Sequence, residues 1–560
     1  MGEQVPWPAP PRHAGPWEDG ASIAPEGNTA LPPLPDASGT MATSTPHNPW
    51  QRALPTADDS GLPVAPASFQ LAPLAPVGHE KSAKKPKSDR APIGLRLLAA
   101  FVVLAMAGSG TYLVLKGGRQ FPSTWDPRVV DIAKWVEGER GLQFKHAVKV
   151  NFLSAELYRE RATAGNDISD PDTKAHFENS AAQMRALGFI SGEVDLAAAS
   201  STLSDSGTLA FYDPAVEQVF VRGTEVTAAL RVTLAHELVH VLQDQHFDLE
   251  RMDEMEDGRA AVLRSLAEGD AGRVEDAYVA KALNDKERAA YEAEMLKSSQ
   301  EALEEVNEKV PPILTTVFTA PYALGPQLVD VLYETGGNKA INAALKDPPS
   351  EEALFDPRTL DTDALDERLA TVEPPKEVEV IDGGEFGPTT WYLMLASRMD
   401  PHIALDATDG WGGDAYSAYR QNDKVCVSVV YRGDTPADAK TLLGALQLWV
   451  AASPEGSASV EGEGARVNFR SCDPGKDAKG SSGNNGDGDV SPDLLSLPVV
   501  RTQIYLQGLQ ADLESDIAAC YAQEVVGAFT FEQLIDPSGS AIGSPDGQSK
   551  LAGAAMTCRN

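Results

Sequence analysis

Residues 234–249 read LAHELVHVLQDQHFDL, and this stretch decides the fold of the region around it. It holds three of the nine histidines of the chain, and the first two, His236 and His240, enclose Glu237 in an H-E-x-x-H pattern. Apolar residues flank the pattern, and Thr224 can cap a helix that runs through TAALRVTLAHELVHVLQDQ. The sequence therefore predicts one continuous helix that carries the whole pattern.

The pattern has the spacing of a catalytic zinc site. Residues i and i+4 share one face of a helix, so His236 and His240 can present two imidazoles to one Zn²⁺ ion. Glu237 lies about 100° round the helix, where it can take a proton from a zinc-bound water. Zinc lowers the pKa of that water from about 16 toward about 7. We therefore predict that Glu237 is a catalytic general base.

Two residues can supply the third protein ligand. His246 stands where the metzincin family has a histidine, in H-E-x-x-H-x-x-G-x-x-H, but Gln243 replaces the glycine that turns the chain there. A helix continuing through Gln243 would carry His246 about 9 Å along the axis from His240. The other candidate is Glu268, in the segment LAEGDA.

Glu268 opens a Glu-Gly-Asp-Ala segment that resembles the E-G-x-A motif of gluzincins, whose third ligand comes from a second helix. The small Gly269 and Ala271 would let this helix pack closely against the first. Roughly residues 140–450 also resemble a family of uncharacterised, often membrane-anchored, zincin-like proteins. The segments that carry this resemblance are a strand-YDP-strand order, TLAHELVHVLQDQHFDL, LAEGDA, PYALGPQLVDVLYETGGNKAINAALKDPP, GGEFG and GWGGDAY.

This resemblance implies a gluzincin-type zinc peptidase with the metal ligands His236, His240 and Glu268. It makes His246 a structural residue or one that orients a ligand, held by its neighbour Asp248. Further candidates are predicted from residue type and position alone. Asp270 or Asp244 can orient a ligand imidazole through its second nitrogen, and Tyr322 or Tyr212 can stabilise an oxyanion. An edge strand near 216–221 can pair with an extended peptide.

The periodicity of the chain predicts an α+β fold. A mostly helical zincin-like domain with a small β-sheet spans 125–375, including a strand at 147–153 and a hairpin at 209–222. A smaller α+β domain spans 377–472, with two strands joined at Asn422-Asp423 and a tight turn at 411–414. A flexible linker at 473–492 and a small helical segment at 493–560 follow.

The four cysteines predict two disulfides if this region lies outside the cytoplasm. We expect neighbours to pair, Cys426 with Cys472 and Cys520 with Cys558, against the alternative of four buried free thiols.

The first 92 residues are rich in Pro, Ala, Ser and Gly and predict a disordered cytoplasmic tail. The uncharged run 97–115 predicts one transmembrane helix rather than a cleaved signal, because apolar residues continue past the cleavage-like Ala105-Met-Ala107. Basic residues crowd its N-terminal side, so the positive-inside rule places the remainder outside the cell membrane.

The formal net charge of −35 argues against a nucleic-acid partner. The polar residues that follow the motif, Gln243, Asp244 and Gln245, argue against an intramembrane protease. Two functions are left: a membrane-anchored zinc metallopeptidase that acts on peptide or protein substrates, and an inactive zinc-binding scaffold or adhesion protein on the cell surface. The presence of Glu237 favours the first, because a pure binder has no need of a base.

Overall fold

The structure is a computed structural model that describes residues 121–206, 208–360, 372, 374–478, 490–536 and 538–558. The expected tail (1–92) and transmembrane helix (97–115) lie outside these residues. No helix in the described ranges is both long and apolar enough to cross a membrane. The described residues form a mixed α+β fold, which confirms the predicted class.

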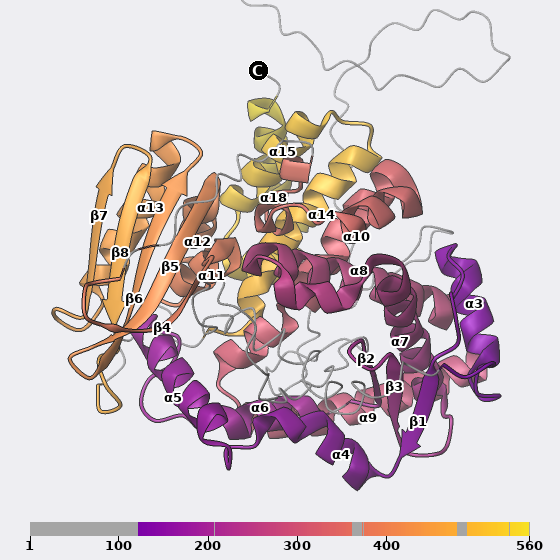
Figure 1. Cartoon of the computed structure of the whole chain (residues 1–560). Helices are drawn as coiled ribbons and strands as arrows, with labels where there is room; N and C mark the ends of the chain where they lie inside the picture. The colour runs from indigo at the N-terminus through magenta and orange to yellow at the C-terminus, as the bar shows by residue number, and fades with distance from the viewer. Residues whose placement is uncertain are drawn as a thin grey trace, which may run out of the picture.

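A three-stranded sheet flanks the predicted zinc-binding helix (Figure 1). It contains β1 (Lys149–Leu153), β2 (Ala210–Asp213) and β3 (Gln218–Arg222) in the order β1-β3-β2. The predicted strand and hairpin are both present. The expectation of an edge strand near 216–221 was wrong, because β3 is central: it pairs in parallel with β1 and antiparallel with β2. Its backbone groups are therefore not open to an extended peptide.

The helix that carries the H-E-x-x-H pattern is α7 (Ala228–Phe247). Its cap is Thr227, whose hydroxyl accepts a hydrogen bond from the amide of Leu230, so the expectation of Thr224 was three residues early. The last helical residue is Phe247, and the C-cap Asp248 has a left-handed backbone with φ 60°. It therefore runs through Gln243 without the turn that a metzincin site requires.

The predicted second helix is α8 (Asp257–Lys281), which a short 3₁₀ turn, η3 (Leu249–Glu254), joins to α7. It lies against α7 and against the long α10 (Pro312–Lys346), while α9 (Asp285–Lys309) packs on α7. Gly269 faces α10 rather than α7, because a Cβ there would lie 2.6 Å from the carbonyl carbon of Gly325. The expected role of Gly269 against α7 was therefore wrong.

The five-stranded second sheet has the order β4-β5-β6-β8-β7, and every pair is antiparallel. The predicted turn at Asn422-Asp423 is present, and both residues have positive φ. The expected tight turn at 411–414 is instead the start of a strand, with an irregular register between Trp411 and Asp414. The strands are β4 (Glu379–Gly384), β5 (Trp411–Gln421), β6 (Lys424–Gly433), β7 (Ala458–Glu463) and β8 (Arg466–Cys472).

The other helices pack around the two sheets and α10 (Figure 1). α3 (Val130–Arg140) packs on α7, α4 (Ala155–Thr163) on β1 and β3, α6 (Leu196–Asp205) on α4 and α9, and α5 (Pro171–Ala186) on β6 and β8 of the second sheet. Three belong with the second sheet: α11 (Gly387–Ala396), α12 (Pro401–Thr408) and α13 (Pro436–Ala451). The last five are α14 (Ser496–Gln510), α15 (Ser515–Ala528), α16 (Phe531–Ile535), α17 (Ser540–Gly543) and α18 (Pro545–Thr557). Short 3₁₀ turns are η2 (Ala164–Asn166), η4 (Glu351–Leu354), η5 (Pro357–Leu360) and η6 (Pro492–Leu495).

One hydrophobic core joins the two sequence regions that we expected to form separate domains. It runs from α5 and α6 through α8 and α10 into the second sheet and the C-terminal helices. Buried polar contacts cross the same boundary: Arg185 of α5 binds both carboxylate oxygens of Asp473, at 2.9 and 2.8 Å. Because burial here is shared, we expect the two regions to support each other's stability.

Both expected disulfides are present, Cys426–Cys472 and Cys520–Cys558. The first joins the facing strands β6 and β8, and the second ties α15 to the end of α18. Neighbour pairing is therefore confirmed.

Candidate metal centre

The two histidines of the pattern and Glu268 meet between α7 and α8. Nε2 of His236 lies 3.0 Å from Nε2 of His240, and Oε2 of Glu268 lies 3.3 Å from the first and 3.4 Å from the second. His240 and Glu268 are buried, and His236 is nearly so. Among the described residues, these three form the one cluster of His, Cys, Asp and Glu with metal-ligand spacing.

The spacing of the three ligand atoms is close to that around a tetrahedral zinc ion, with the two imidazole nitrogens nearer to each other, at 3.0 Å, than such an ion requires. Zinc binds nitrogen and oxygen at about 2.0–2.2 Å, which places neighbouring ligand atoms of a tetrahedron about 3.3–3.5 Å apart. The three distances between His236, His240 and Glu268 are 3.0, 3.3 and 3.4 Å. Two imidazoles and one carboxylate leave the fourth position open for a water or a substrate, as catalytic zinc sites require.

The second nitrogen of each imidazole is also held. Nδ1 of His236 lies 3.0 Å from Oε2 of Glu275, and Nδ1 of His240 lies 2.9 Å from Oε1 of Gln243. The amide nitrogen of Gln243 donates to Asp270 and to the carbonyl of Ala267, so its oxygen faces the imidazole. Both partners can accept a hydrogen bond from Nδ1–H and leave Nε2 directed at the centre, which is the arrangement that zinc ligands usually have.

Glu275 and Gln243 were not among the residues predicted from the sequence to contact the imidazoles. Glu275 follows Glu268 by seven residues on α8, so two helical turns bring both carboxylates to one face. That spacing was a usable signal. Gln243 follows His240 by three residues on the same face of α7, but we considered it only as a replacement for a glycine.

Asp270 and Asp244, which we expected to orient the imidazoles, form hydrogen bonds with other residues. Asp270 contacts the imidazole of His240 only through Gln243. Its Oδ2 accepts hydrogen bonds from Gln243 and from the buried Arg140. Asp244 accepts hydrogen bonds from the hydroxyl of Tyr212 at 2.6 Å and from the amide of Leu249 at 2.8 Å. Neither carboxylate bonds directly to a ligand histidine.

His246 lies away from the centre. It is exposed, and its Nε2 lies 2.8 Å from the backbone oxygen of Gln143. The structure therefore brings Glu268, and not His246, to the two imidazoles. The expected partner of His246 was Asp248, but the bond shown is to Gln143 instead.

Glu237 is buried beside the same centre. Its Oε2 accepts a hydrogen bond of 2.8 Å from the backbone amide of Tyr212, on strand β2. Burial raises the pKa of Glu237, and the nearby charges of His240 and His236 oppose that rise without cancelling it. A carboxylate with a raised pKa, fixed by a backbone donor beside the two imidazoles, is suited to accepting a proton.

The electrostatic field at the centre favours a cation. Burial is the largest single influence on His236 and lowers its pKa, yet hydrogen bonds to Glu268 and Glu275 prevail and raise that pKa well above the usual value. Burial likewise raises the pKa of Glu268, but the two histidines outweigh it and hold that carboxylate ionised.

The two candidate tyrosines differ in their surroundings. The Tyr212 hydroxyl donates to Asp244, so its ring is committed to that contact. Tyr322 is buried on α10 close to Glu268 and Glu237; burial first, and then the charge of Glu268, raise its pKa well above the usual value. Burial raises the pKa of Tyr212 as well, so both hydroxyls stay neutral. Tyr322 is the one whose surroundings include Glu268 and Glu237, where a hydroxyl can donate to developing negative charge.

Comparison with known proteins reaches only the second sheet. Residues 376–480, which contain β4 to β8, match a family described as "Domain of unknown function (DUF8575)". No curated protein and no solved structure matches the chain. The metal centre lies outside the matched residues, so its interpretation depends on its own geometry.

Proposed function

We propose that this protein is a zinc-dependent metallopeptidase of the gluzincin type. His236 and His240 of α7 and Glu268 of α8 would hold Zn²⁺, which would supply a Lewis acid and an activated water. Glu237 would take the proton of that water and pass it to the leaving amine. Tyr322 would donate a hydrogen bond to the oxyanion of the tetrahedral intermediate.

The observation that carries the proposal is the triangle of His236, His240 and Glu268 with Glu237 beside it. The three ligand atoms have spacings of 3.0–3.4 Å that suit one zinc ion. A zinc-binding scaffold or adhesion protein would need the triangle alone. Glu237, a buried carboxylate held by the amide of Tyr212, adds a group that can transfer a proton, which a scaffold does not need.

The proposed location is the outer side of a cell membrane, with residues 97–115 as the anchor. The two disulfides support a non-cytoplasmic compartment, because cytosolic thiols are kept reduced.

The first experiment measures the metal content and the peptidase activity of the full-length chain. We expect about one zinc per chain in the wild type and cleavage of a mixed-sequence fluorogenic peptide library. Glu237→Gln should keep the zinc and lose about 10²–10⁴-fold in rate, because it removes the base and not a ligand.

His246→Ala is the matched control, since this exposed histidine of the same helix should leave both zinc and rate unchanged. A wild type without metal would refute the proposal. Zinc binding with no cleavage, or with a rate that Glu237→Gln does not change, would leave the scaffold function instead.

A further inference from the structure

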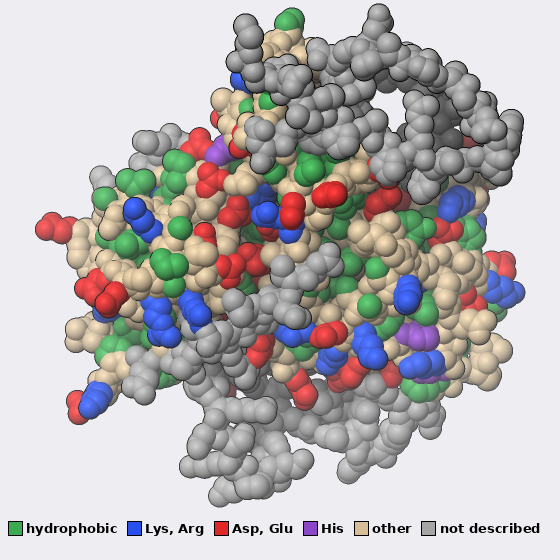
Figure 2. Space-filling model, turned by 90° about the horizontal axis from the view of Figure 1, so that it is seen from above, with side chains coloured by type: hydrophobic (Ala, Val, Ile, Leu, Met, Phe, Trp, Pro, Cys, Tyr) green, Lys and Arg blue, Asp and Glu red, His purple; other side chains and the backbone are tan. Residues whose placement is uncertain are grey.

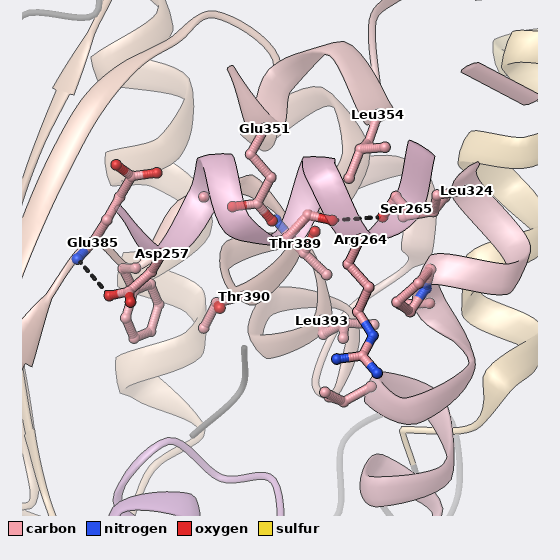
Figure 3. A pocket seen from close by; sticks show the side chains of 16 residues that line it. Asp257, Arg264, Ser265, Leu324, Glu351, Leu354, Glu385, Thr389, Thr390 and Leu393 are labelled. Carbon is pink, nitrogen blue, oxygen red and sulfur yellow. Dashed lines mark hydrogen bonds between the residues drawn. The ribbon is translucent and has the colours of Figure 1, made fainter. Parts of the chain in front are cut away.

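A pocket lies between the N-terminal half of α8, α10, η4 and α11 (Figure 3). Its walls include apolar side chains of Val317, Leu324, Leu354 and Leu393. Carboxyl groups gather at one end, where Asp257 and Glu385 are labelled in Figure 3, and the side chain of Arg264 extends from α8 at the other end. The pocket is therefore polarised, with one cation apart from the acids.

Arg264 is unusual among the buried arginines of this protein. It is 3% exposed, and its Nε and Nη1 atoms have no hydrogen-bond partner within the described ranges. Three other buried arginines bind carboxylates directly: Arg140 at 2.7 Å, Arg185 at 2.8 Å and Arg501 at 2.8 Å. Burial lowers the pKa of Arg264, yet a guanidinium keeps its charge in proteins. An unpaired buried cation is costly, so its position calls for a partner.

Glu268 forms no hydrogen bond with Arg264, although its negative charge opposes the effect of burial on the pKa of Arg264. Glu268 lies one helical turn beyond Arg264, and its Oε2 already faces the two imidazoles. No ion pair within 4.0 Å joins Arg264 to a carboxylate of the described chain. The unused N–H groups are therefore available to an anion that enters the pocket.

We propose that Arg264 binds a carboxylate of the substrate within about two residues of the scissile bond. This inference rests on the metallopeptidase proposal, and it assigns the substrate class as short peptides or chain ends that carry a carboxylate. A planar guanidinium pairs with a carboxylate through two parallel N–H···O bonds. The four residues from Arg264 to Glu268 rise about 6 Å along the helix, and one extended residue spans at most about 3.6 Å, so the two sites are about two residues apart.

Two sources of the carboxylate are distinguished by the probes. The first pair is N-acetyl-trialanine and its C-terminal amide, which differ only in the terminal carboxylate. The second pair is an N-acetylated, C-terminally amidated tripeptide that ends in glutamate or in glutamine. Calorimetry measures their affinities for the full-length chain, with and without zinc. We expect one acid to bind about 10- to 100-fold tighter than its neutral partner, as for hydrogen bonds to charged groups.

Three variants test whether Arg264 is responsible. Arg264→Met should abolish the preference for acids, and Arg264→Lys should keep part of it. Arg259→Met is the matched control, because Arg259 lies on the same helix, outside the pocket lining, and bonds to the backbone of Pro348. Arg264→Met should also raise the melting temperature, because it removes a buried unpaired charge; an arginine with a structural role would lower it.

The outcomes separate the two proposals. Equal affinity of acids and neutral partners for the wild type, or a preference that survives Arg264→Met, overturns the role of Arg264. If the wild type binds and cleaves peptides through zinc without that preference, only this inference fails. If the wild type binds no zinc but shows an Arg264-dependent preference, the peptidase proposal fails and the carboxylate site stands.

Discussion

Two buried glutamates, Glu268 of α8 and Glu351 of the neighbouring pocket, have opposite electrostatic surroundings. Glu268 is 4% exposed and faces two imidazoles, which hold it ionised. Glu351 is 6% exposed, accepts a hydrogen bond from the amide of Thr389, and faces the like charges of Asp414 and Asp257. Equal burial therefore does not decide the charge of a carboxyl group; its neighbours do.

The charge distribution gives the two glutamates different uses. Glu268 stays anionic and can bind a metal, whereas burial raises the pKa of Glu351 to about 7, so this carboxyl group holds its proton below about pH 7. The charged side chains on the surface are not separated in this way. On the face in Figure 2, acidic and basic side chains are interspersed among small apolar groups. The following predictions test the contrast between Glu268 and Glu351, from the largest expected effect to the smallest.

The largest expected difference is in the zinc content of variants at Glu268 and at Glu351. Glu268→Gln replaces an anionic ligand by a neutral amide, and we expect zinc to fall from about one per chain to near zero after dialysis. Glu351→Gln should keep the full amount. Elemental analysis of both variants measures this, and equal loss in both would show that zinc depends on general folding rather than on the triangle.

The stability of the fold should depend on pH through Glu351. The unfolded chain ionises this group near its usual pKa of 4.5, while the folded chain resists ionisation until about pH 7. Its contribution is therefore fully present below about pH 4.5 and is lost as the pH rises to about 7. Glu351→Gln should gain about 2–3 kcal/mol over the wild type above pH 7 and nothing below pH 4.5.

Denaturant unfolding at several pH values measures this difference. Glu304→Gln, at an exposed position of α9, is the control and should follow the wild type at every pH. A constant offset between Glu351→Gln and the wild type would contradict the raised pKa.

Zinc affinity should respond moderately to Glu275. Glu275→Gln keeps an oxygen near Nδ1 of His236 but removes its charge, and we expect zinc to bind about 10- to 100-fold more weakly. Competition with a chelator measures the affinity, with Glu304→Gln again as the control. No change would mean that Glu275 only fills space beside the imidazole.

Much of the candidate site could be predicted because helix geometry is local. The spacing of His236 and His240 places both on one face whatever surrounds them. Glu268 was predicted in another way, from the resemblance of residues 268–271 to the gluzincin E-G-x-A motif. The start of α7 could not be settled in the same way, because Thr224 and Thr227 are both good capping residues by type, and the structure uses Thr227.

Positions that depend on two distant segments were the ones missed. The strand near 216–221 is central because β1, some seventy residues earlier, covers its outer edge. Gly269 approaches Gly325 of α10, and no local pattern shows which helix a glycine will face. Residues of 125–375 and of 377–472 likewise share one hydrophobic core, and only the packing of the helices and strands shows this.

By itself, the sequence determined the ligand face of α7, the candidate base Glu237, and the regions in which helices, strands and disulfides would form. These depend on backbone periodicity and side-chain chemistry within short segments. Only the tertiary structure decided that Glu268 completes the triangle, that Glu275 and Gln243 hold the imidazoles, and that Arg264 is left unpaired. Such contacts join residues on separate helices, and their distances follow from how the helices pack.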